Sequence, residues 1–249
     1  MTTAPSTHTA KFFNGDWVQL APWYYDPLHD YAFFKYEPSM LKTKPIEIEL
    51  APEKARRNTE FMVVGNDNGE KLSSAVGYLD DVMRGPPEYS SNGLELVDVN
   101  TVYYTSLTMN SRGSSGAPVL DVDGKALAIV GGGSSSSRHI MMLPLHQAKK
   151  TLAILQDGEL PPRGTIQAVL VRKEPSELER IGFPVDEVIA MSGEFRKEKG
   201  LLQIESTVPR GPAFQKLMQG DVLALADGKP VSEHHHCRIP RQPAVRGVC

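Results

Sequence analysis

Residues 112–129, RGSSGAPVLDVDGKALAI, combine two features that decide the fold. The apolar segments on either side of DVDGK (121–125) have strand length, and an Asp-Gly pair between two such segments is typical of a β-hairpin turn. Glycines flank Ser114 and Ser115, and glycine lets the backbone turn sharply enough for neighbouring amide N–H groups to converge. The stretch predicts a hairpin that follows a serine turn. The turn is either a flexible connection or the site of a nucleophile.

Strand-length segments recur throughout the first 155 residues and are rich in Val, Ile, Tyr and Phe. A second turn sequence, NDNGE at 66–70, lies between two of them. Many short strands at this spacing predict an all-β barrel or sandwich. The predicted strands are 17–25, 31–36, 46–50, 61–65, 74–82, 101–109, 117–122, 126–131 and 139–145.

A change of pattern follows this β region. Residues 145–159 have helical apolar spacing with Gly158 as a stop signal, and LPPRG at 160–164 indicates a linker and domain boundary. Beyond it the sequence predicts a small α+β module. Its predicted strands are 164–173, 200–208 and 221–231, and its predicted helices are 175–182 and 211–220.

Composition narrows the class of protein. The chain has 249 residues and a net charge of -3, so nothing indicates a nucleic-acid partner. No apolar segment approaches the roughly 20 residues of a membrane span, and the first residues lack the pattern of a secretory signal. Both cysteines lie near the C-terminus, so no disulfide is expected in the folded part. The tail at 232–249, which contains HHHC, is expected to be disordered rather than to bind a metal.

A serine nucleophile needs a base, a group that orients the base, and donors for the oxyanion. Gly113 and Ser115 stand in the relation that brings two backbone N–H groups together, which leaves Ser114 as a spacer. A candidate orienting carboxylate is Asp30, which precedes an apolar strand where a buried carboxylate would otherwise be costly. The residues alone leave open that Asp30 merely caps a turn after Pro27.

Several motifs occur together in the order of one family. DPLHDYAFFKY (26–36), VVGNDNGEKLS (63–73), the 112–129 stretch, LPL (143–145) and PRGTIQ (162–167) resemble the HtrA/Deg serine proteases. The resemblance covers about residues 11–231 and is greatest to the large fungal and plant branch with duplicated protease–PDZ units. It departs from the family only mildly at Ala117, which is usually glycine or serine there.

The resemblance implies a fold and a domain order. Residues 1–159 would form a chymotrypsin-like double β-barrel that lacks the first strands of its first barrel. Residues 160–231 would form a partial PDZ domain without its last helix and strand, followed by the tail at 232–249.

The resemblance also implies a function and its residues. Ser115 matches the nucleophile and Asp30 the triad aspartate, with the N–H groups of Gly113 and Ser115 as oxyanion hole. Gly131, Gly132 and Gly133 match the substrate-pairing strand that borders the specificity pocket. The implied activity is serine endopeptidase in protein quality control, on unfolded or damaged polypeptides, without metal or cofactor.

For the second module the resemblance implies capture of peptide C-termini. Gly200, Leu201 and Leu202 match a loop whose N–H groups receive a terminal carboxylate, and the strand from Gln203 would pair with the peptide. Family members form homo-oligomers. The compartment stays open between nucleus, cytoplasm and chloroplast.

The catalytic histidine is expected roughly thirty residues before the aspartate, and counting back from Asp30 passes Met1. We therefore expect residues 1–249 by themselves to be inactive. His29 is expected to play a structural role, and His8 lies in a polar start that predicts no structure. The alternative is a non-catalytic scaffold or pseudoprotease. An α/β-hydrolase is disfavoured because helices are nearly absent before residue 145.

Overall fold

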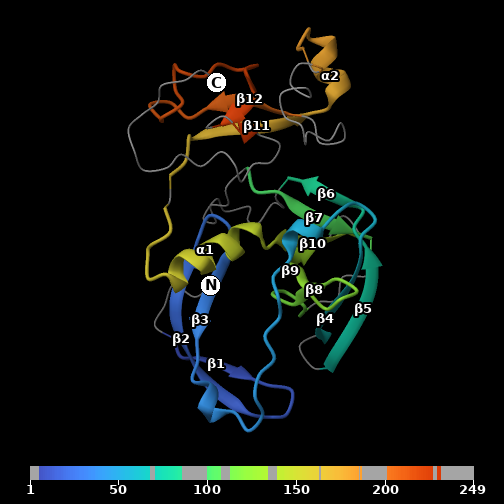
Figure 1. Ribbon diagram of the computed structural model, residues 1–249, viewed down its shortest axis with the longest axis vertical. Helices are drawn as coiled ribbons and strands as arrows, with labels where there is room; N and C mark the ends of the chain where they lie inside the picture. The colour runs from blue at the N-terminus through green and yellow to red at the C-terminus, as the bar shows by residue number, and fades with distance from the viewer. Residues whose placement is uncertain are drawn as a thin grey trace. The chain divides into compact units, whose positions relative to one another are not determined.

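The computed structural model describes residues 6–67, 71–85, 100–107, 113–133, 139–162, 164–184, 186, 201–226 and 229–230. Its contacts divide the chain into two units (Figure 1). The first comprises Met1–Asp98 and Tyr103–Ala148, and the second comprises Val99–Val102 and Lys149–Cys249. Strands dominate the first unit, which confirms the mainly β prediction.

Three antiparallel strands form the N-terminal sheet, in the order β1-β2-β3 (blue in Figure 1). They are β1 (His8–Lys11), β2 (Trp17–Asp26) and β3 (Tyr31–Lys35), and the 3-10 turn η1 (Pro38–Met40) follows. The sequence predicts β2 and β3 but indicates no structure around His8. β1 forms because residues 8–11 pair with residues 17–20 of β2, a tertiary contact that its polar composition does not reveal.

A seven-stranded sheet makes up the rest of the first unit, in the order β5-β4-β8-β9-β10-β7-β6 (Figure 1). All of its pairs are antiparallel. Its strands are β4 (Glu60–Asp67), β5 (Lys71–Tyr78), β6 (Asp81–Arg84), β7 (Tyr103–Ser106), β8 (Pro118–Leu120), β9 (Ala126–Gly133) and β10 (Ile140–Pro144).

The hairpin predicted around DVDGK is confirmed as β8–β9. Asp121 is buried, and its carboxylate accepts hydrogen bonds from the amides of Asp123 at 3.0 Å and Lys125 at 2.8 Å. Gly124 has φ +78°, the left-handed conformation that glycine adopts without steric cost. The turn residues thus fix the register of the strand that follows the serine turn.

Two predictions about this sheet are wrong. Residues 46–50 form no strand and contribute only an isolated bridge between Leu50 and Ala126. Ile46 is 92% exposed, so the alternating pattern there has no sheet face to bury. The segment predicted as one strand at 74–82 is two, because the chain turns at Leu79–Asp80 between β5 and β6.

Two clusters of buried side chains hold the first unit together. One lies within the seven-stranded sheet and includes Phe61, Val119 and Met142. The other joins Tyr31 of the N-terminal sheet to Tyr103 and other residues of the larger sheet. Burial of large side chains such as these contributes about 1.5–3 kcal/mol each, so the second cluster fixes the start of β3 against the larger sheet.

The helix predicted at 145–159 is confirmed as α1 (His146–Gln156). It ends at Gln156, two residues before Gly158, whose φ of +81° agrees with the predicted stop signal. The N–H of Gly158 donates to the carbonyl of Leu155, and that of Glu159 donates to the carbonyl of Ile154. These two hydrogen bonds around a glycine in the left-handed conformation satisfy carbonyl groups in the last turn of the helix.

The second unit contains a three-stranded sheet in the order β11-β12-β13. Its elements are β11 (Ala168–Lys173), α2 (Pro175–Arg180), β12 (Leu201–Thr207), β13 (Val222–Leu223), β14 (Leu225–Ala226) and β15 (Lys229–Pro230). The prediction of a helix at 211–220 is wrong. Gln215 has φ +62°, a left-handed conformation that interrupts a helix, and the segment forms turns around the buried Ala213.

Candidate functional site: the serine turn and the edge of β9

The serine turn separates its two serines. Ser114 is 5% exposed, whereas Ser115 is exposed at the tip of the turn. Gly113 and Gly116 on either side have φ of +99° and +82°, so both positions require the freedom of glycine. The turn is closed by a hydrogen bond from the Ala117 amide to the Ser114 carbonyl at 2.9 Å. Of the two serines, only Ser115 is exposed to solvent.

Ser114 is buried because it packs against β4. A Cβ atom added at Gly65 would lie 2.9 Å from Ser114 Oγ, and 3.2 Å from the Cβ atoms of Ser114 and Ala117. These distances are too short for unstrained contact, so only glycine at position 65 lets the turn lie this close to the strand. Gly65 is therefore a positioning residue that the sequence analysis missed. No local sequence signal identifies it, because the contact joins positions 49 residues apart.

The turn is also joined to the end of β9. The Gly116 amide donates to the Val130 carbonyl at 2.7 Å, and the Val130 amide donates to the Ala117 carbonyl at 2.9 Å. These two bonds place Ser115 next to the predicted substrate-pairing residues, because Val130 directly precedes Gly131. The structure thus brings together two parts of the site that were predicted separately.

The last residues of β9 have a free edge among the described residues. Gly132 and Gly133 pair with Met141 and Ile140 of β10, and Gly131 falls at the register shift. On the opposite edge, the pairing with β8 ends at Ile129. An extended chain could pair with this edge beyond Val130, as strand addition requires.

Two backbone N–H groups of the turn have no hydrogen-bond acceptor among the described residues. Within the described part of the chain, neither the amide of Gly113 nor that of Ser115 donates a hydrogen bond to a protein acceptor. Both belong to the exposed part of the turn. Unsatisfied donors of this kind can stabilise a developing oxyanion without having to break other bonds.

The carboxylates of the β2–β3 hairpin differ from the prediction. Asp30, expected beside a buried strand, is exposed and has φ +52°. The buried carboxylate is Asp26, 4% exposed, which accepts from the amides of Leu28 at 3.1 Å and His29 at 3.2 Å and contacts His29 Nδ1 at 3.0 Å. The turn-capping role that the residues left open for Asp30 is thus performed by Asp26, four residues earlier.

These contacts predict a pH effect. Burial by itself would raise the pKa of Asp26, but the hydrogen bonds from His29 and Leu28 outweigh it and lower the pKa below its ordinary value of 3.8. The ionised form therefore stabilises the fold above about pH 4, and this contribution is lost as the pH falls through the lowered pKa of the folded state. We expect Asp26→Asn to reduce the free energy of unfolding at pH 7 by about 1–3 kcal/mol and to flatten its acid dependence.

The matched control for this prediction is Asp30→Asn, since Asp30 is exposed. Chemical denaturation of both variants between pH 3 and pH 7 measures the effect. The control is expected to stay within about 0.5 kcal/mol of the parent. Equal losses in the two variants would contradict the assignment of Asp26 as the stabilising carboxylate.

Asp30 is tied to the rest of the unit through its neighbour. Tyr31 is 5% exposed and packs with Tyr103 and Met141 in the second buried cluster. The left-handed conformation costs an aspartate less conformational energy than it costs most other residues. It still indicates a constrained backbone immediately before β3. The position of Asp30 is therefore set by the core even though its side chain faces solvent.

The residues predicted to receive a peptide carboxylate do not form an open loop. Gly200 lies outside the described residues, while Leu201 and Leu202 are buried within β12 and pair with Lys173 and Arg172 of β11. Leu202 and Gln203 also pair with β13 on the other side. At Leu202 and Gln203 both edges of β12 are therefore paired within the second unit.

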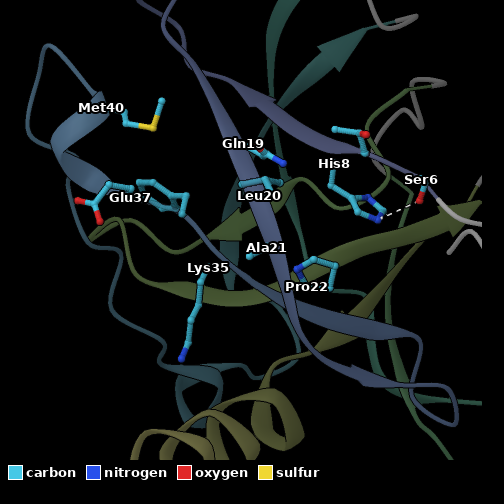
Figure 2. A pocket seen from close by; sticks show the side chains of 11 residues that line it. Ser6, His8, Gln19, Leu20, Ala21, Pro22, Lys35, Glu37 and Met40 are labelled. Atoms are coloured by element: carbon cyan, nitrogen blue, oxygen red, sulfur yellow. Dashed lines mark hydrogen bonds between the residues drawn. The ribbon is translucent and has the colours of Figure 1, made fainter.

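A pocket on the N-terminal sheet is a separate feature. Figure 2 shows its lining residues, which come from the segment before β1, from β1, β2 and β3, and from η1. Ser6 Oγ and His8 Nε2 lie 3.1 Å apart, but both residues are on the surface and two positions apart in the chain. None of the predicted site residues lines this pocket, so we do not assign the catalytic site to it.

Histidine contacts do not complete the serine site within the described residues, where no hydrogen bond joins Ser115 to a histidine. His29 is held by Asp26. The HHHC segment of the tail lies outside the described residues. Among those that are described, no cluster of three His, Cys, Asp or Glu side chains has the arrangement of a metal site.

No helix in the described part of the chain combines the length and apolar character that crossing a bilayer requires.

Comparison with known proteins agrees with this geometry. Residues 3–129, just over half of the chain, match the trypsin-like peptidase domain family. The chain is 38% identical over 224 residues to the pro-apoptotic serine protease NMA111 of Yarrowia lipolytica, which covers 90% of this chain and 23% of that protein. It is 36% identical over 241 residues to Protease Do-like 7 of Arabidopsis thaliana, covering 92% of this chain and 22% of that protein. The chain thus spans less than a quarter of these relatives.

Among solved structures, the HtrA-type protease AlgW with a decapeptide has a similar fold. The TM-score is 0.60 at 18% sequence identity, and the match covers 94% of this chain and 67% of the AlgW chain. AlgW with a tripeptide gives the same TM-score. The family match, the relatives and the fold agree with one another, and the chain belongs to the trypsin-like peptidase family, in which its relatives are HtrA-type serine proteases.

Proposed function

We propose that this chain carries the nucleophile and substrate-binding half of an HtrA-type serine endopeptidase, with Ser115 as the nucleophile. The observation that supports this most is the turn itself. Ser114 is buried against Gly65 and Ser115 is exposed. The Gly116–Val130 bond joins the turn to the part of β9 that no longer pairs with β8 among the described residues.

In the proposed reaction, Ser115 Oγ attacks the carbonyl carbon of the scissile peptide bond and its proton passes to a histidine base. The N–H groups of Gly113 and Ser115 stabilise the resulting oxyanion. The C–N bond then breaks as the base returns the proton to the leaving amine, and water hydrolyses the acyl-enzyme by the same route. Asp30 is the proposed group that orients the histidine.

The substrate is proposed to lie along β9. An extended polypeptide would pair with the edge at Gly131–Gly133, where the absence of side chains leaves room for an apolar residue of the substrate. A folded protein rarely offers an extended segment that is free to pair on both sides. We therefore propose unfolded or damaged polypeptides as substrates and protein quality control as the role.

The second unit is proposed to be a PDZ-like module that binds extended peptides and their C-termini. Because both edges of β12 are occupied, the proposed strand for such binding is β11, at the end of its sheet. Homo-oligomerisation is proposed from the family resemblance.

For residues 1–249 by themselves we propose low catalytic activity, since the histidine base is not assigned to any of their residues. A non-catalytic scaffold is the second candidate function. The lack of a hydrogen bond between Ser115 and a histidine in the described residues favours it. The two candidates differ in whether a longer polypeptide containing these residues hydrolyses peptide bonds.

The substrate proposal is tested by comparing one protein in two states. A polypeptide extended toward the length of its relatives is incubated with a small disulfide-bonded protein, either native or reduced and carboxymethylated. We expect cleavage of the unfolded form at least 100-fold faster than that of the native form, because only the former offers an extended segment. Equal rates would contradict the substrate class, and no cleavage of either form would favour the scaffold.

A further inference from the structure

The edge of β11 carries an unexpected occupant, the side chain of Asn100. Its Nδ2 donates to the carbonyl of Ala168 at 2.8 Å, and its Oδ1 accepts from the amide of Leu170 at 2.9 Å. Asn100 lies 68 and 70 positions before these residues, and the contact division places it in the second unit with them. A segment far away in sequence is thus attached to the backbone of β11.

The two bonds have the pattern of strand pairing. In a β-ladder, an added strand bonds the carbonyl of one residue and the amide of the residue two positions later. The Asn100 amide uses one of its two N–H donors and its oxygen to bond these two groups. A primary amide has the same chemistry as a peptide unit, so Asn100 takes the place of one residue of an added strand.

The bonded groups lie on the outer edge of β11. The carbonyl of Gln167, one position before Ala168, accepts from the Val208 amide at 2.9 Å. The register between β11 and β12 shifts between Val169 and Leu170, so the side on which the Ala168 carbonyl and the Leu170 amide lie is taken from their bonds to Asn100. β11 is also the end strand of its sheet. The Asn100 contact therefore occupies the edge where a peptide strand could add.

We propose that the Asn100 side chain is an intramolecular plug on the peptide-pairing edge of β11. An extended peptide that pairs with Ala168 and Leu170 must displace both Asn100 bonds. The plug lowers the apparent affinity by the fraction of molecules in which the edge is closed. The expected partner is an extended polypeptide segment that is recognised through its backbone. Because such a segment must displace the Asn100 amide, only segments that make more contacts with β11 than Asn100 does are expected to bind.

This inference rests on the proposed peptide binding of the second unit but not on hydrolysis. Its first test needs no peptide. In Asn100→Ala, the Leu170 amide loses its acceptor, so its hydrogen exchange measured by NMR is expected to accelerate about tenfold or more. The Leu202 and Ile204 amides of β12 should exchange as before. Asn66→Ala, at an exposed position of β4 in the first unit, is the matched control and is expected to leave Leu170 exchange unchanged.

The second test measures binding directly. The probe is a pool of decapeptides with free carboxyl ends and random apolar residues in the last three places, titrated into the same NMR samples. We expect Asn100→Ala to bind the pool about tenfold more tightly than the parent, with the Leu170 amide shift moving in both. Pools methylated on the backbone nitrogens should not bind, since they cannot form a ladder.

Asn100→Asp provides a second variant if the alanine variant is poorly folded. It keeps an acceptor for the Leu170 amide but replaces the donor with a charge facing the Ala168 carbonyl, so it should also open the edge. Equal affinity of parent and variants for the pool would overturn the proposal, and so would a pool that binds neither. Unchanged exchange at Leu170 in Asn100→Ala would overturn it as well. Since no arm measures cleavage, these failures are distinct from a failure of the proposed protease activity.

Discussion

Replacing Ser115 with alanine is expected to abolish peptide hydrolysis by a polypeptide that contains residues 1–249 and the base, with a loss of about a million-fold in kcat. Ser114→Ala should cost at most about tenfold, the equivalent of one hydrogen bond. The reason is the opposite placement of the two hydroxyls. Ser114 is 5% exposed and packs on Gly65, whereas Ser115 is exposed near the end of β9, where the described pairing with β8 stops at Ile129.

The two neighbouring serines control for each other, because both substitutions remove one hydroxyl from the same turn. Initial rates on a fluorogenic peptide, with KM and kcat determined separately, measure the effect. A million-fold loss for Ser114→Ala with activity retained in Ser115→Ala would reverse the assignment. Comparable moderate losses in both variants would contradict a nucleophilic role for either serine.

The second large effect is expected at Gly65. Gly65→Ala places a Cβ atom 2.9 Å from Ser114 Oγ and 3.2 Å from two further carbon atoms, so the serine turn must move away from β4. Overpacking of this kind costs about 1–3 kcal/mol of folding free energy. The displaced turn should also react more slowly at Ser115, because the proposed oxyanion donors would move with it.

Gly85→Ala is the matched control, since a Cβ atom at Gly85 meets nothing within 4 Å. Urea denaturation should show a change within about 0.5 kcal/mol for the control and the full loss for Gly65→Ala. Adding Ser114→Gly to Gly65→Ala should recover part of the lost stability, because it removes two of the three close contacts. Similar losses at positions 65 and 85, or no recovery in the double variant, would contradict the proposed contact.

Turns and helix ends that depend on a few neighbouring residues were predicted correctly from the sequence. The Asp-Gly turn at 121–125 and the glycine stop at 158 act through conformations within a few residues, and both form as expected. The serine turn belongs to the same class, since its glycines adopt the left-handed conformations that its sequence permits. The resemblance to one family then connected these local features in the correct order.

The errors arose where tertiary contacts override local pattern. Residues 46–50 alternate like a strand but find no partner beyond one bridge, and β1 forms from a polar segment because β2 offers an edge. Residues 211–220 have a helical pattern, but the left-handed conformation of Gln215 interrupts a helix there. Periodicity records which side chains could be buried together, and it does not show whether a partner surface is present.

The carboxylates show the same limit at the site. Asp26 and Asp30 both flank the hairpin loop, and sequence alone could not decide which of them is buried. Gly65 and Asn100 were missed for a related reason, because their importance depends on contacts 49 and about 70 positions away along the chain. Such contacts leave no motif in a single sequence.

The central proposal is that Ser115, and not Ser114, is the nucleophile. The most direct test is covalent labelling with a fluorophosphonate, followed by mass-spectrometric location of the adduct. We predict an adduct on Ser115 in a polypeptide that contains residues 1–249, and none in Ser115→Ala. An adduct on Ser114, or labelling that persists in Ser115→Ala, would contradict it.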